Sequence, residues 1–76
     1  MLIYVKDAHY LKDYQITIEF TDGLSKTVNL QQHLNGKVFE PLKDMEYFRK
    51  FKVNKDTETI EWSNGADFAP AFLYNL

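Results

Sequence analysis

Residues 14–30 contain the feature that most constrains the fold, which is two alternating apolar and polar runs around Asp22 and Gly23. This pattern predicts a β-hairpin, and the burial of one face decides its register. A two-residue loop would set apolar residues opposite polar ones. A three-residue loop over residues 21–23 requires a left-handed residue at its end, which Gly23 supplies. This register pairs apolar residues with each other: Phe20 with Leu24, Ile16 with Val28, and Tyr14 with Leu30.

The length of 76 residues predicts one domain over residues 1–76. A domain of this size buries little apolar surface, so its fold needs a further source of stability besides an ordinary hydrophobic core. The chain has no cysteine, and therefore no disulfide framework and no thiolate zinc site. Its 12 aromatic residues favour dense aromatic packing, a partner chain, or both.

The charge pattern and the first residues exclude several classes of protein. A net charge of −2 gives no reason to expect nucleic-acid binding. Lys6 and Asp7 interrupt the opening apolar run too early for a signal peptide, and no other run is long enough to span a bilayer. We therefore expect a soluble, cytoplasmic protein that makes no use of a membrane.

Around the central hairpin, the pattern predicts several short elements. Residues 2–10 are β-rich and are followed by a turn at 11–13, but Lys6, Asp7 and His9 spoil the alternation, so the register stays open. Residues 30–35 resemble one helical turn, ended by a left-handed Gly36. Residues 38–42 form a connector, because Pro41 excludes a central strand.

Three further elements complete the predicted α+β fold. Asp44 is placed to cap a helix that ends at residue 48. Residues 50–54 and 59–63 form a second hairpin with a four-residue loop, which sets Phe51 opposite Trp62, Val53 opposite Ile60 and Lys52 opposite Glu61. Pro70 suits the first turn of a short helix over residues 70–75.

The sequence offers no constellation that supports catalysis. His9 and His33 have no metal-ligand spacing, and Ser25 and Ser63 lack a nucleophile elbow. The three glycines stand alone rather than in a phosphate-binding loop. We therefore predict no enzyme activity, no catalytic residue, no metal site and no cofactor.

One basic cluster lies between residues 49 and 55. Arg49, Lys50 and Lys52 lie near aromatic residues, a mixture that can follow a phosphate backbone. The alternative is a solvated strand face in which Lys52 pairs with Glu61 across the hairpin. We favour the second interpretation, so nucleic-acid contact is the secondary hypothesis.

Lys26 shares a face with the apolar residues of the central hairpin. An inward-pointing charge is one way in which an edge strand avoids unwanted pairing. The strand over residues 24–30 is therefore either a protected edge or an edge kept for one chosen partner by strand addition. The partner-binding candidates are Ser25, Lys26 and Thr27, and the partner is another small protein or a second copy.

Several segments resemble the successive motifs of the family known as domain of unknown function 2442. They are Phe20–Gly23, Phe39–Asp44, Thr59–Trp62 and Asn64–Pro70. The resemblance covers nearly the whole chain, and the segment 62–74 is its most specific part. It departs from the family pattern at Asn29, where aspartate is usual, and at Ser63, where proline is usual.

The resemblance implies a small cytoplasmic α+β protein, mostly of prokaryotes and phages, with no established activity. Many members are encoded beside another small uncharacterised protein, which implies an antitoxin-like role in a two-protein pair. Some relatives carry a helix-turn-helix domain. From its residues, the motif around Trp62 is structural: Asn64 and Gly65 turn the chain, Asp67 caps the last helix and Pro70 fixes its entry. The alternative is a polar pocket of Asn64 and Asp67 beside Trp62.

Overall fold

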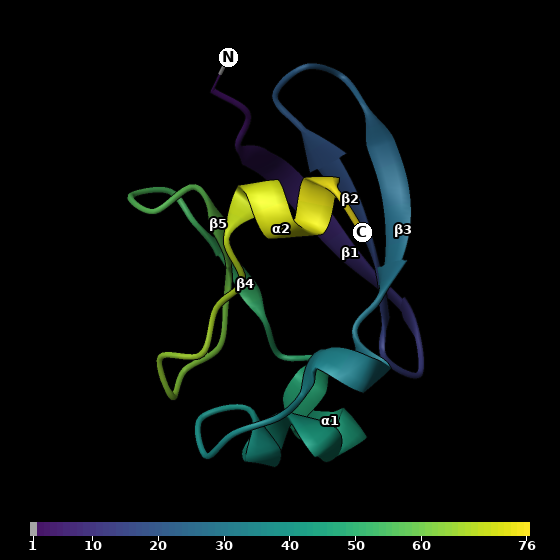
Figure 1. Cartoon of the computed structure of the whole chain (residues 1–76), viewed down its shortest axis with the longest axis vertical. Helices are drawn as coiled ribbons and strands as arrows, with labels where there is room; N and C mark the ends of the chain where they lie inside the picture. The colour runs from purple at the N-terminus through teal and green to yellow at the C-terminus, as the bar shows by residue number, and fades with distance from the viewer. Residues whose placement is uncertain (1) are drawn as a thin grey trace.

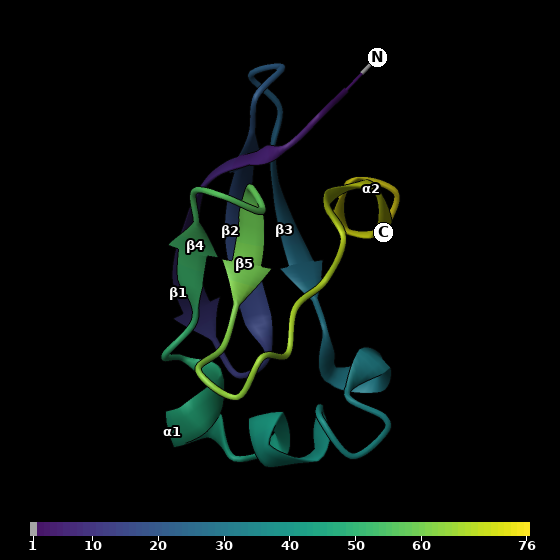
Figure 2. The ribbon, with the colours of Figure 1, turned by 90° about the vertical axis from the view of Figure 1, so that its left-hand side faces the viewer.

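A three-stranded antiparallel sheet in the order β1-β2-β3 organises the molecule (Figure 1). The computed structural model describes residues 2–76 and confirms a small α+β fold. In Figure 2 a second, two-stranded sheet lies in front of the first, and the last helix lies beside β3. The strands are β1 (Val5–Lys12), β2 (Gln15–Phe20), β3 (Ser25–Asn29), β4 (Lys52–Asn54) and β5 (Thr59–Glu61), and the last helix is α2 (Pro70–Tyr74).

The register predicted for the central hairpin is confirmed. Ile16 pairs with Val28, and the Phe20 amide donates to the Leu24 carbonyl at 2.8 Å. Gly23 has a φ of 90°, as the three-residue loop requires. The alternating pattern thereby places the apolar side chains of both strands in one buried core.

β1 differs from the strand predicted at residues 2–10. It begins at Val5 and includes Leu11 and Lys12, which were expected in the turn. The chain reverses after them, at Asp13, whose φ of 49° is a conformation that aspartate tolerates better than most residues. The pairing with β2 shifts register at two points, one near each end of β1. These irregularities explain why no single alternation fits this strand.

The middle of the chain forms three short helices, η1 (Gln31–His33), η2 (Glu40–Lys43) and α1 (Met45–Phe48). The helical turn expected at residues 30–35 is thus a shorter 3₁₀ turn. The connector expected at 38–42 is also partly helical, because proline fits the first turn of a helix. The predicted cap is confirmed, since the Asp44 carboxylate accepts from the Glu46 amide at 3.1 Å.

The second hairpin has the predicted register, with Lys52 opposite Glu61 and Val53 opposite Ile60. Glu58 ends its four-residue loop with a φ of 58°. The helix α2 begins at Pro70 as predicted.

Aromatic packing supplies much of the core, as the composition predicted. The indole of Trp62 is buried, and its N–H donates to the Phe48 carbonyl at 2.7 Å. Its ring centroid lies 5.6 Å from that of Phe48, 6.1 Å from Phe51 and 6.0 Å from Phe68. Trp62 therefore joins α1, the small hairpin and the segment that leads to α2.

Candidate functional site

The open edge of β3 is the main candidate site. β3 pairs with β2 on one side only, so the predicted edge position is confirmed. The bonds from Phe20 to Leu24 and from Leu30 to Tyr14, at 2.8 and 2.9 Å, fix which backbone groups face β2. Because these groups alternate along an antiparallel strand, the amides and carbonyls of the odd-numbered residues point outward. The outward residues are Ser25, Thr27 and Asn29, and no strand of residues 2–76 pairs with β3 on that side.

The side chains of these residues lie on the polar outer face of the sheet. The hydroxyls of Thr27 and Thr17 lie 3.0 Å apart. The Asn29 side chain accepts from the Gln31 amide at 3.0 Å, which directs the chain from β3 into η1. Because these side chains are small and uncharged, a strand added at this edge would bind mainly through its backbone.

Lys26 points to the core side of the sheet, as the register predicted. Its Nζ donates to the carbonyls of Tyr74 at 2.9 Å and Leu76 at 2.7 Å. These carbonyls lie at the end of α2, where backbone acceptors are left free and the helix dipole attracts a cation. Lys26 therefore fastens α2 to β3, a role that the sequence pattern did not indicate.

Asp22 makes a second connection between the hairpin tip and α2. The Tyr74 hydroxyl donates to Asp22 Oδ2 at 2.6 Å, and the Leu24 amide donates to Oδ1 at 3.0 Å. The bond from Tyr74 and then that from the Leu24 amide lower the pKa of the Asp22 carboxyl below its usual value. The same carboxylate raises the pKa of the Tyr74 hydroxyl. Asp22 therefore serves both the turn and the attachment of α2.

Two exposed apolar side chains lie on the segment 70–76. Phe72 is 39% exposed and Leu76 is 41% exposed, and the Leu76 carbonyl accepts from Lys26 of β3. The Phe72 ring meets His33, which follows β3 in η1, edge-on at a centroid distance of 5.1 Å. The sequence carries no motif that singles out either residue.

The residues of the basic cluster lie in two different surroundings. Arg49 lies 3.7 Å from Glu46 and over the ring of Tyr10 at 5.4 Å. Lys50 and Lys52, in contrast, border a hollow of about 150 Å³ that Glu61 also lines. Acidic groups thus accompany the basic side chains on both sides.

The motif around Trp62 builds a turn, as its structural interpretation predicted. The Asn64 side chain accepts from the Ala66 amide at 3.0 Å and donates to the Val38 carbonyl at 2.8 Å. Gly65 has a φ of 90°. Both ends of the Asn64 amide are therefore engaged with backbone.

The role expected of Asp67 is wrong. The helix α2 starts after Ala69 without a side-chain cap, whereas Asp67 lies earlier and forms an isolated backbone bridge with Glu61. Pro70 favours the start of the helix without a capping side chain, because its ring fixes φ and it has no backbone N–H that needs an acceptor.

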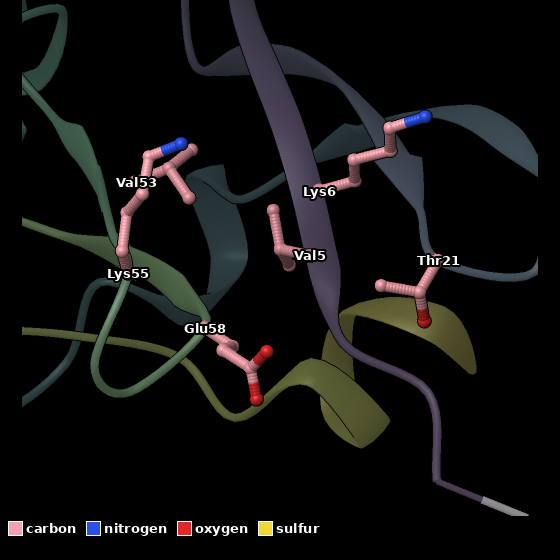
Figure 3. A pocket seen from close by; sticks show the side chains of 6 residues that line it. All are labelled: Val5, Lys6, Thr21, Val53, Lys55 and Glu58. Carbon is pink, nitrogen blue, oxygen red and sulfur yellow. The ribbon is translucent and has the colours of Figure 1, made fainter.

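A small hollow lies where β1, the hairpin tip and the β4–β5 loop meet (Figure 3). Its volume is about 190 Å³, and two of its lining residues are joined by a hydrogen bond of 2.9 Å from the Val5 amide to the Glu58 carbonyl. The two lysines point away from the Glu58 carboxylate, so the charged groups do not converge on one ligand. The lining residues are Val5, Lys6, Thr21, Val53, Lys55 and Glu58.

Two other kinds of site were sought in residues 2–76. No group of three or more histidine, cysteine, aspartate or glutamate side chains is arranged to hold a metal ion there. None of the helices in this part of the chain has the length and apolar character needed to cross a membrane.

The fold and the β3 edge together define a small α+β domain in which β3 has no strand on its outer side. The chain belongs to the family described as protein of unknown function (DUF2442), whose family model matches residues 5–76. Searches of the curated proteins and of the solved structures found no significant match.

Proposed function

We propose that this protein is a non-enzymatic interaction module that binds an extended segment of another protein by adding it as a strand beside β3. The observation that carries this proposal is the row of outward backbone groups at Ser25, Thr27 and Asn29. An incoming strand would pair with these groups, as in other cases of strand addition.

The exposure of the β3 edge supports this proposal. Ser25, Thr27 and Asn29 are exposed, and their outward backbone groups have no partner strand, so an incoming segment can reach them. Phe72 and Leu76 add exposed apolar surface on the segment 70–76, which Lys26 bonds to β3, and side chains of the incoming segment can pack on it.

The family resemblance suggests the kind of partner. A small protein encoded beside this one is the first candidate, with this chain as the antitoxin-like member of the pair. Both would act in the cytoplasm. In this arrangement the antitoxin-like chain restrains its companion by holding one of its segments as an extra strand of the sheet.

Proline at position 27 tests the proposal directly. Thr27→Pro removes one outward amide, while the bonds to β2 come from neighbouring residues and remain. Thr27→Val is the matched control, because it loses the same hydroxyl contact but keeps the amide. We expect the protein encoded next door to co-purify with wild type and Thr27→Val but not with Thr27→Pro.

Hydrogen exchange locates the interface independently of the variants. The amides of Ser25, Thr27 and Asn29 should exchange rapidly in the free protein and become protected in the complex. Equal co-purification with all three proteins, or a complex in which these amides still exchange rapidly, would refute strand addition at β3.

A further inference from the structure

Residues 70–76 lie over the core side of the sheet and end near β3, whose edge an added strand would use. In Figure 1 α2 lies in front of the sheet, between β5 and β3, and Lys26 bonds the end of this segment to the core side of β3. A strand paired with β3 would lie about 4.8 Å beyond it, next to the end of α2. The segment 70–76 therefore restricts access to the edge from the core side.

Few hydrogen bonds hold the segment to the central hairpin. They are the two from Lys26 and the one from Tyr74 to Asp22. The other contacts are made by side chains: Leu73 is fully buried, the Tyr74 ring meets Phe20 edge-on at 5.0 Å, and the Phe72 ring stacks on Phe68 at 5.5 Å. Within residues 2–76, no backbone hydrogen bond joins this segment to β3. A short helix held to the sheet by side chains alone is a unit that can open locally.

We propose that residues 70–76 form a latch over β3, and that opening this latch allows β3 to pair with β3 of a second copy of the chain. The inference rests on the proposed function, because it concerns access to the same edge. The latch keeps the edge from pairing with other copies until a second copy at high concentration displaces it.

The edge is complementary to itself in one antiparallel register. With the two-fold axis at Thr27, the two Thr27 residues exchange hydrogen bonds, and Ser25 of each copy does so with Asn29 of the other. Lys26 then lies opposite Val28 of the second copy. No two like charges face each other in this register, whereas an axis at Lys26 would place two ammonium groups opposite each other.

The test weakens the latch without touching the outward backbone. Lys26→Met removes both hydrogen bonds but keeps most of the side-chain stem, and Tyr74→Phe removes the bond to Asp22 but keeps the ring on Phe20. Lys26→Arg retains a cationic donor and is the matched control. Sedimentation velocity from about 1 µM to about 1 mM protein measures self-association.

We expect the double variant, Lys26→Met with Tyr74→Phe, to associate at least about tenfold more strongly than wild type, because its open form is more populated. The Lys26→Arg protein should behave as wild type. Adding Thr27→Pro to the double variant should abolish the association. Circular dichroism checks that each variant is folded, and Tyr74→Phe alone is the milder substitute if the double variant is not.

Two results would overturn the latch. One is a folded double variant, or a folded Tyr74→Phe protein if the double variant does not fold, that associates no more strongly than wild type. The other is an association that survives Thr27→Pro, since pairing would then use another surface. Neither result bears on the proposed function. That proposal is tested separately, by co-purification and hydrogen exchange on proteins in which residues 70–76 are unchanged.

Discussion

Replacing Gly23 by valine tests the register of the hairpin that carries the candidate site. Gly23 has a φ of 90°, and a Cβ built there meets no other atom within 4 Å. The cost of the substitution is therefore conformational rather than steric. A side chain in the left-handed region costs roughly 1–2 kcal/mol, whereas the lost freedom of the unfolded chain returns about 0.4–1 kcal/mol. Because valine is β-branched, we expect a net loss somewhat above about 1 kcal/mol.

Urea unfolding followed by Trp62 fluorescence measures this loss. Trp62 is 2% exposed, so its emission reports on exposure of the core. With a slope of about 1 kcal/mol per molar urea, the midpoint should fall by roughly 1 M while the slope stays unchanged. Gly23→Asn should lose less, because asparagine tolerates the left-handed region. If Gly23→Val left the free energy of unfolding unchanged or raised it, position 23 would not need a positive φ. A loss above about 3 kcal/mol would indicate a steric clash that the structure does not contain.

Three further predictions concern the core, the latch and the basic cluster. Trp62→Phe should lower the free energy of unfolding by about 1–3 kcal/mol, because the buried Phe48 carbonyl loses its donor, and thermal unfolding measures this. The pKa of Asp22 is lowered in the folded state, so its contribution to stability is present above its unfolded value near pH 4 and is lost as pH falls through the folded value. Tyr74→Phe should therefore flatten the decline of unfolding free energy in acid, and an unchanged decline would contradict this. Short duplex DNA or RNA should show no mobility shift at about 0.15 M salt, whereas a micromolar complex weakened by Lys52→Glu would revive the nucleic-acid hypothesis.

The hairpins could be predicted from the sequence because their registers are local. In residues 14–30, one glycine and a strict alternation left a single register with a common apolar face. The same reasoning found the pairing of Lys52 with Glu61. The register of β1 could not be predicted in this way, because its pairing with β2 shifts at two points. A strict alternation of apolar and polar residues does not continue through such shifts.

Only part of the candidate site could be predicted from the sequence, for a different reason. The edge position of the strand and the inward direction of Lys26 follow from local alternation. The partners of Lys26 and Asp22, however, lie 48 to 52 residues away in the sequence. No local pattern indicates such distant contacts. From the sequence, Lys26 is therefore only an inward charge on an edge strand, either protective or kept for a partner, and Asp22 is only a turn residue.

The order in which the chain is synthesised gives these distant contacts a further consequence. The carbonyl that Lys26 binds at Leu76 is made 50 residues after the lysine itself. At ribosomal rates of about 5–20 residues per second, this gap lasts roughly 3–10 s. A hairpin forms about a millionfold faster, within microseconds. The nascent chain therefore has time to pair β2 with β3 before its last helix exists, and Lys26 gains its carbonyl partners only after residues 74–76 have been made.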